Sequence, residues 1–364
     1  MRQMDDTRGD TARIVLHGFR ALWLRESLVG APFANRVFAR PYRSIPGRLL
    51  DWRRKRHLRV DPHPGFYLHE YTAAGGVSVR GIVANLELDR AESLILPHEG
   101  VHPEQVAELA NRMRITQLNP APILLVHRES RALRPVVDAV AAGPPDRTFT
   151  DRADQYHRIW RIDDAEAQHG IGAALADSAL VIADGHHRYA AAWQLHCEEP
   201  GSGWDRTLVM LVDATDSPLQ LGAIHRSVTG CDLDVVEAAA RRRGDEFVRH
   251  PGRPEALAHL HGHLVLGSGD SWATLRPAGD GLLVRKLHEE LLPAWGVGED
   301  RVTYHHAAGK ALAGAESGLA VLLPAPTFEQ IAVEAERGEL LPQKATSFQP
   351  KPHLGGLMRD LRDE

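Results

Sequence analysis

This sequence has few cysteines, no long apolar run and no excess of positive charge, and each of these features argues against a class of protein. The 364 residues include two cysteines, Cys197 and Cys231, so a disulfide framework is excluded and we expect both thiols to be reduced. No apolar stretch approaches the ~20 residues that a helix needs to cross a bilayer. Lys and Arg number 43 against 48 Asp and Glu, a net charge of −5. We therefore expect neither nucleic acid nor a membrane as a partner.

The common nucleotide and hydrolase signatures are also lacking. The chain contains no GxGxxG, GxxxxGK[ST] or GxSxG motif and no protein-kinase signature. Classical Rossmann dehydrogenases, P-loop NTPases, serine hydrolases and protein kinases are disfavoured accordingly.

The composition is that of an ordinary globular protein. Hydrophobic residues make up 43% of the chain and charged residues 25%, values that argue against disorder, collagen and coiled coil. A chain of 364 residues is expected to form two domains or one large α/β unit. The N-terminal segment lacks a clean apolar stretch and a small-residue cleavage site, so we expect a cytoplasmic protein.

Apolar periodicity predicts helices and strands that alternate along the chain. Strands are expected at 65–72, 77–85, 122–127, 156–162, 179–183, 208–213, 264–266, 282–287 and 319–323. Helices are expected at 101–114, 132–142, 165–176, from His187 onward, and at 235–243, 254–263, 288–295 and 328–338. This alternation predicts an α/β or α+β fold with mixed sheets.

Changes in composition divide the chain into consecutive parts. We expect an irregular N-terminal segment, a core with the main motif, a C-terminal α/β subdomain and a last segment, at 1–64, 65–230, 231–340 and 341–364. The last segment is rich in turns, yet Phe348, Leu354 and Leu357 make it too apolar for a free tail. We expect it to dock back on the core.

The sharpest local feature is the string DGHHR at 184–188, where a β-branched strand passes directly into an alanine-rich helix. Gly185 permits a tight turn, and the first turn of a helix offers free N–H groups and a dipole that favour an anion. Arg188 adds a planar fork suited to phosphate oxygens. His186 and His187 can donate hydrogen bonds or transfer protons. The alternative is a plain connection capped by the aspartate; we favour a phosphate site that lines the main pocket.

His98 and Glu99 form a second pair of polar residues, in the string LPHE before the helix predicted at 101–114. They could act as an acid/base or substrate-binding pair. The alternative is that Glu99 only complements the positive end of the helix dipole.

Two further basic groups lie later in the chain. His225 and Arg226 either complete an anion pocket or lie on the solvent face of a strand. Lys344, followed by Thr and Ser between two prolines, could contact phosphate, with an exposed tail as the alternative.

Seven segments, in this order along the chain, resemble one family. They are RGI at Arg80–Ile82, PHE at Pro97–Glu99, RITQLNPAPILLV, IADGHHRYAAA, IHR at Ile224–Arg226, VTYHH at Val302–His306 and PQKATSFQPK. On these segments the chain resembles the bacterial and archaeal family known as domain of unknown function 1015 (DUF1015). The resemblance covers roughly residues 35–357, and DGHHRY is its most specific motif.

A second resemblance is confined to the motif. DGHHR at a strand–helix junction is similar to the phosphate-binding element of the ParB/sulfiredoxin superfamily, which includes nucleotide-binding partition proteins, sulfiredoxin and free-serine kinases. It implies a ParB/sulfiredoxin-like nucleotide-binding core with added elements. The positions that match the phosphate-binding element are Asp184, Gly185, His186, His187 and Arg188. The serine-kinase branch uses ADP or ATP with Mg²⁺, so the resemblance implies these cofactors here.

The chain departs from the family pattern at two places. The APPYD-like N-terminal segment reads ARPYRSI at Ala39–Ile45, so Arg43 replaces the acidic residue. The C-terminal stretch, PPKSTFFYPK in the family, reads LPQKATSFQPK, so the lysine matches at Lys344 and the Ser/Thr position is Ala345-Thr346. If the acidic residue bound substrate or metal, we expect a changed substrate or reduced activity.

Together these features predict a nucleotide-dependent phosphotransferase, an ATP- or ADP-dependent kinase of a small hydroxyl substrate such as free serine. We expect its phosphate-binding residues to be Gly185, His187 and Arg188, with Arg226 and Lys344 as further cations. Catalytic roles, as base, Mg²⁺ contact or orienting group, are expected for Asp184, Glu99, His98 and His186. The alternatives are a non-catalytic nucleotide-binding regulatory module and a phosphatase or other hydrolase that uses the same anion pocket. A metal-dependent hydrolase should bring three His, Asp or Glu side chains within metal-binding distance.

Overall fold

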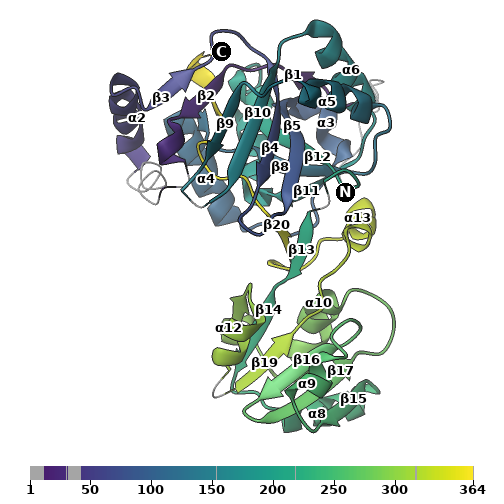
Figure 1. Ribbon diagram of the computed structural model, residues 1–364. Helices are drawn as coiled ribbons and strands as arrows, with labels where there is room; N and C mark the ends of the chain where they lie inside the picture. Colours follow the sequence, from purple (N-terminus) through teal and green to yellow (C-terminus); the bar gives the residue numbers. More distant parts are fainter. Residues whose placement is uncertain are drawn as a thin grey trace, which may run out of the picture. The chain divides into compact units, whose positions relative to one another are not determined.

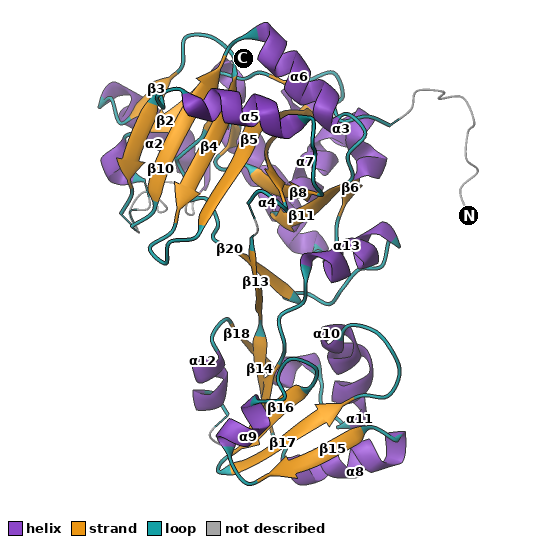
Figure 2. Cartoon of the chain, turned by 45° about the vertical axis from the view of Figure 1, so that its right-hand side comes forward, coloured by secondary structure: helices purple, strands orange, loops and turns teal. Residues whose placement is uncertain are grey.

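The computed structural model describes residues 12–29, 31, 42–152, 154–217, 219–315 and 318–363. The chain forms two compact units (Figure 1 and Figure 2). Unit 1 comprises Met1–Leu96, Val101–Leu219 and Pro350–Glu364, and unit 2 comprises Pro97–Gly100 and Gln220–Gln349. Each unit is therefore made of segments that are not consecutive, whereas the sequence analysis divided the chain into consecutive parts.

A mixed nine-stranded sheet forms the centre of unit 1. Its strands are β1 Leu16–His17, β4 Phe66–Thr72, β5 Ser78–Glu87, β6 Ile95–Leu96, β8 Ile123–His127, β9 Arg147–Thr150, β10 Tyr156–Ile162, β11 Leu180–Asp184 and β12 Arg206–Asp213. They lie in the order β6-β11-β8-β12-β5-β4-β10-β9, with β1 beside β5. The pairs β8/β12 and β6/β11 are parallel and the others antiparallel.

Helices of unit 1 contribute to two clusters of buried apolar residues. The helices are α2 Ile45–Arg54, α3 Leu88–Ala91, α4 Pro103–Thr116, α5 Leu133–Ala142, α6 Ala165–Leu175 and α7 His186–Glu198. Helices α5 and α6 bury apolar residues against Ile82, Ala84 and Leu86 of β5, which alternate along the strand and so share one face of the sheet. Helices α4 and α7 form a second apolar cluster around Trp204.

A small four-stranded sheet ties the C-terminus to unit 1. It has the order β3-β2-β21-β7 and consists of β2 Ala21–Leu24, β3 Leu58–Val60, β7 Leu118–Asn119 and β21 Met358–Asp360. Arg359 of β21 is fully buried. Its guanidinium donates to the carbonyl oxygens of Gly203 at 2.7 Å and Arg206 at 2.5 Å, so the buried charge is well hydrogen-bonded.

Unit 2 is built on a six-stranded antiparallel sheet of order β15-β17-β16-β19-β14-β18, beside which β13 and β20 form a separate pair. The strands are β13 Gln220–Ala223, β14 His225–Thr229, β15 Glu246–His250, β16 Leu264–Ser268, β17 Ser271–Arg276, β18 Val302–His305, β19 Gly318–Leu322 and β20 Thr346–Gln349. Its helices are α8 Leu233–Arg243, α9 Arg253–Leu257, α10 Leu283–Lys286, α11 Leu292–Ala294, α12 Ala308–Ala313 and α13 Phe328–Glu336.

The alternating helices and strands and the mixed sheet confirm the predicted fold class. The strand predicted at 282–287 is wrong, because this segment forms α10. Val284, Leu287 and Leu291 are buried there at a spacing of three and four residues, the period of one helix face. In the part of the chain that the structure describes, no helix is both long enough and apolar enough to cross a membrane.

Gly81 of β5 lies so close to β12 that any side chain would clash. A Cβ atom there would lie 2.6 Å from the carbonyl oxygen of Leu211. We expect Gly81→Ala to lower the free energy of unfolding by about 1–3 kcal/mol, the usual cost of overpacking. Gly172, inside α6, is the control, because a Cβ there meets no atom within 4 Å. Gly172→Ala should raise that free energy by about 1 kcal/mol. Urea unfolding of both variants checks the contrast, and equal effects would contradict it.

Candidate functional site

The DGHHR string forms the junction that the sequence analysis expected, with β11 ending at Asp184 and α7 beginning at His186. Gly185, between them, has a φ of 103°, a conformation that side chains of L-residues disfavour. A Cβ atom at Gly185 would lie 2.9 Å from Nη2 of Arg188. The absence of a side chain therefore allows Arg188 to fold back over the turn.

Arg188 folds back onto the carboxylate of Asp184. Its Nη2 donates to Oδ2 of Asp184 at 2.6 Å, and its Nη1 donates to the carbonyl oxygens of Ala121 at 3.0 Å and Pro122 at 2.8 Å. The other carboxylate oxygen, Oδ1, accepts a hydrogen bond from Nζ of Lys351 at 2.5 Å. One carboxylate thus holds two cations that come from widely separated parts of unit 1.

The charge on Asp184 is stable at neutral pH. Burial by itself would raise the pKa of this carboxyl group, but the positive charges of Arg188 and Lys351 outweigh burial and leave the pKa below its ordinary value. The side chains of all three residues are partly exposed, by 26% at Asp184, 23% at Arg188 and 42% at Lys351. Solvent therefore reaches this group of charges, which we call the Asp184 cluster.

The two histidines of the motif lie in the first turn of α7 and are half-buried. Nε2 of His187 accepts a hydrogen bond from the backbone N–H of His102 at 3.1 Å. Partial burial, and then the nearby His102 ring, lower the pKa of His187. The neutral His187 ring therefore helps to hold the segment that leads into α4.

The expectation that the motif lines the main pocket stays a prediction; within unit 1 the motif borders a small cavity. Arg188 borders a cavity of about 20 Å³ together with Asn119 and Thr207. A larger hollow of unit 1, of about 350 Å³, is lined by Trp23, Arg25, Lys55, Arg56, His57, Arg59 and other residues remote from the motif in sequence.

Four other predicted site residues belong to unit 2: His98, Glu99, Arg226 and Lys344. The turn at 344–346 brings them together. Glu99 accepts hydrogen bonds from the backbone N–H of Thr346 at 3.1 Å and from its hydroxyl at 3.2 Å, and also from the N–H groups of Lys344 and Ala345. Nε2 of His98 lies 2.9 Å from the same hydroxyl.

The pKa of Glu99 is shifted in the opposite direction to that of Asp184. Burial raises the pKa of Glu99, although the hydrogen bonds from the turn at 344–346 act in the other direction. No cation is hydrogen-bonded to this carboxylate among the interactions of the described residues. Glu99 is therefore the predicted site carboxylate that can accept a proton closest to neutral pH.

Arg226 is fully buried, so the alternative that it lies on the solvent face of its strand is wrong. Its Nη2 donates to the carbonyl oxygen of Lys344 at 3.1 Å and its Nε to Nε2 of His288 at 3.1 Å. Its guanidinium lies 4.9 Å from the ring centre of Tyr304, and so does the ammonium group of Lys344. Burial lowers the pKa of Arg226 to about 10, which leaves it charged and available to hold the turn.

The segment with the main departure from the family pattern is described only in part. Ala39–Pro41 lie outside the described residues, whereas Arg43 lies in a short 3-10 turn and is exposed. Lys351 of the Asp184 cluster was not predicted from the sequence. It is the second lysine of the string PQKATSFQPK, and this position in a matching segment could have marked it as a further cation. Asp151, His157 and His353 were not predicted either; their side chains lie close together although His353 is 202 positions from Asp151.

Comparisons with solved structures gave several similar chains of low identity. A mutant free serine kinase in complex with AMP has a TM-score of 0.45 and 18% identity, covering 78% of this chain and 91% of that chain. SbnI with a C-terminal truncation, from Staphylococcus aureus, has a TM-score of 0.46 and 14% identity, covering 77% and 88%. A conserved hypothetical protein from Pyrococcus furiosus has a TM-score of 0.42 and 18% identity, covering 77% and 96%.

The family comparison covers most of the chain. No curated protein matches it. The model of the family described as protein of unknown function (DUF1015) matches residues 23–291, a range that includes the DGHHR junction and both His98 and Glu99. The resemblance drawn from the sequence is thereby confirmed, and the chain belongs to the DUF1015 family.

Proposed function

We propose that this protein is a nucleotide-dependent phosphotransferase that acts on a small hydroxyl substrate, with free serine as one candidate acceptor. The observation that carries the proposal is the Asp184 cluster, in which Arg188 and Lys351 converge at the start of α7. Phosphate oxygens are bound by charge-assisted donors and by helix N-termini. Unit 1 supplies both kinds of donor at one partly exposed place.

The donors of the Asp184 cluster fit a nucleotide phosphate accompanied by Mg²⁺. The carboxylate oxygens of Asp184 now accept from Arg188 and Lys351, and phosphate oxygens can accept from the same two groups. Asp184 would then be free to offer an ionised oxygen ligand, the type that Mg²⁺ prefers. Positioning and charge neutralisation of this kind provide most of the catalysis in phosphoryl transfer.

The remaining assignments from the sequence stay predictions. We propose Gly185 and His187 as part of the phosphate site and His186 as a group that orients or protonates an oxygen. We also propose acid–base roles for His98 and Glu99 and a charge-neutralising role for Lys344. Arg226 donates to protein acceptors, so we propose that it supports the turn at 344–346.

Lys351→Ala tests the phosphate site. The risk to the fold is small, because the Lys351 side chain is partly exposed and Asp184 keeps its ion pair with Arg188. We expect ATP and ADP to bind about 10- to 100-fold more weakly, the scale of a charge-assisted hydrogen bond. Isothermal titration calorimetry measures the change. The matched control is Lys55→Ala, an exposed lysine of unit 1 that pairs with Asp51. Equal affinities in both variants and the wild type would reject the site.

Asp184→Asn separates nucleotide binding from transfer. The variant loses the negative charge that competes with phosphate for Arg188 and Lys351, so ADP should bind at least as tightly without Mg²⁺. Because the amide is a poor Mg²⁺ ligand, Mg²⁺-dependent transfer should fall by at least 100-fold. The assay follows phosphate transfer from ATP or ADP to a panel of amino acids and other small hydroxyl compounds.

Three outcomes of that assay distinguish the candidate functions. Transfer to one acceptor by the wild type supports a kinase. Tight nucleotide binding without turnover supports a regulatory binding module. Release of inorganic phosphate without any acceptor supports a hydrolase, and absence of nucleotide binding in the wild type refutes both the kinase and the nucleotide-binding module.

Glu99→Gln tests the proposed general base in unit 2. Glutamine keeps an acceptor oxygen for the N–H groups of the turn at 344–346, so the fold should be retained. If Glu99 accepts the hydroxyl proton, kcat should fall by about 10²–10⁴-fold while nucleotide affinity stays unchanged. The specific sign of a general base is that the fall in rate at low pH disappears in the variant, because glutamine does not titrate. Unchanged kcat would show that Glu99 only holds the turn.

A further inference from the structure

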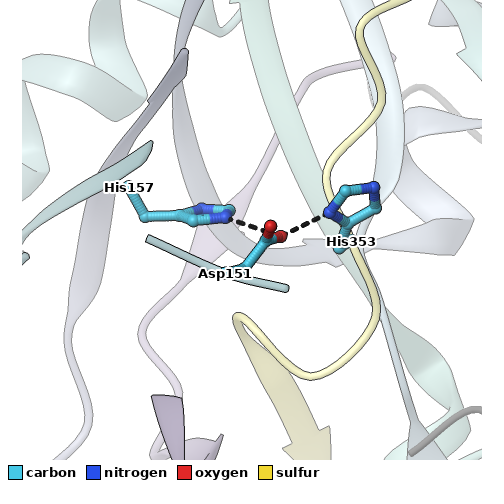
Figure 3. Close-up of side chains that lie close together, drawn as sticks. All are labelled: Asp151, His157 and His353. Atoms are coloured by element: carbon cyan, nitrogen blue, oxygen red, sulfur yellow. Dashed lines mark hydrogen bonds and ion pairs between the residues drawn. The ribbon is translucent and has the colours of Figure 1, made fainter. Parts of the chain in front are cut away.

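A group of three side chains outside the Asp184 cluster has the composition of a metal site. Asp151 follows β9, His157 lies in β10, and His353 lies in the segment between β20 and β21 (Figure 3). Their ligand atoms all lie within 4.8 Å of one another, and among the described residues no other three His, Cys, Asp or Glu side chains do so. All three residues belong to unit 1.

The spacing of the ligand atoms suits a tetrahedral ion. Nε2 of His157 lies 3.2 Å from Oδ2 of Asp151. With zinc–ligand distances of about 2.0–2.1 Å, the edge of a tetrahedron is about 3.3 Å. Nδ1 of His353 contacts the same Oδ2, so a bound ion requires His353 to move outward. His353 is able to move because it is 33% exposed, whereas the side chains of Asp151 and His157 are fully buried.

Neighbouring residues already orient the two buried ligands. Nδ1 of His157 lies 3.0 Å from Nε2 of His69, which can accept its proton and leave Nε2 of His157 for a metal. The His157 ring also stacks on Phe149, with ring centres 4.5 Å apart. Oδ1 of Asp151 accepts the backbone N–H of Gln155 at 3.0 Å, so Oδ2 is directed toward both imidazoles. Such outer partners are typical of metal-binding histidines and carboxylates.

We propose that Asp151, His157 and His353 bind a zinc ion. Two imidazoles and one carboxylate suit zinc, whereas Mg²⁺ and Ca²⁺ prefer oxygen ligands alone. Three protein ligands leave a fourth position for water or another small ligand. The partly exposed His353 marks the side from which that ligand arrives. Its ligands differ from the residues proposed to contact Mg²⁺, and the proposal does not depend on the phosphotransferase function.

The alternative is a hydrogen-bonded trio without metal, in which both imidazoles donate protons to Asp151. The two alternatives differ in whether the thermal stability of the protein depends on a bound metal. With zinc, the ion links this segment to β9 and β10, so the thermal stability of the full chain should depend on the metal. In a trio, zinc addition should not change the melting temperature.

The test titrates metal-free, full-length protein with Zn²⁺ by calorimetry and with Co²⁺ by its visible absorption. We expect tight binding of one ion at the site, the intense absorption of four-coordinate Co²⁺, and a higher melting temperature with Zn²⁺. His353→Gln and His157→Gln should each weaken binding at least 100-fold and abolish the rise in melting temperature. His69→Phe should weaken it about 10- to 100-fold, as removal of an outer partner does.

His63→Gln is the matched control, because His63 is an exposed histidine of unit 1 that precedes β4. This variant should bind Zn²⁺ like the wild type. If His157→Gln fails to fold, His353→Gln still tests the proposal, because the His353 side chain is partly exposed. The proposal is overturned if the wild type lacks the four-coordinate Co²⁺ spectrum. It is also overturned if His353→Gln binds Zn²⁺ as tightly as His63→Gln.

Discussion

The ionised carboxylate of Asp184 is the group on which the candidate site of unit 1 depends. It joins the end of β11 to the first turn of α7 through Arg188, and to the C-terminal segment through Lys351. Arg188 extends the connection to the carbonyl oxygens of Ala121 and Pro122, just before β8. A carboxylate held between two cations stays charged, so this arrangement keeps two charge-assisted donors together at one partly exposed place.

The C-terminal segment of unit 1 contributes to two sites because its backbone is held by buried side chains. The hydroxyl of Tyr71 donates to the carbonyl oxygen of Pro350 at 2.9 Å, and Nε2 of Gln155 donates to that of Lys351 at 3.0 Å. Lys351 then contacts Asp184, and His353 contacts Asp151. One short segment therefore provides a cation for the Asp184 cluster and a ligand for the proposed zinc site.

Asp184 and Glu99 show how different surroundings give two carboxylates different chemistry. Burial alone would raise the pKa of both groups. Two cations reverse this tendency at Asp184, whereas the hydrogen bonds that Glu99 accepts from the N–H and hydroxyl groups of the turn at 344–346 do not outweigh its burial. Asp184 is therefore suited to hold cations and Glu99 to exchange a proton. In the sequence, Arg188 lies four positions after Asp184 and gives a local sign of this difference, whereas Lys351 comes from 167 positions away.

Local patterns in the sequence were sufficient to predict the mixed fold class, the strand–turn–helix geometry of DGHHR and the family. These features depend on residues adjacent in the chain: apolar periodicity sets the elements, and Gly185 permits the turn. The helix at 283–286 was missed because a short apolar run has no distinct period until its neighbours show which face is buried. Only the tertiary structure decided that Arg226 is buried, that Lys351 completes the Asp184 cluster, and that His353 reaches Asp151. These contacts join residues up to 202 positions apart, and pairing over such separations is determined by the packing of the whole unit.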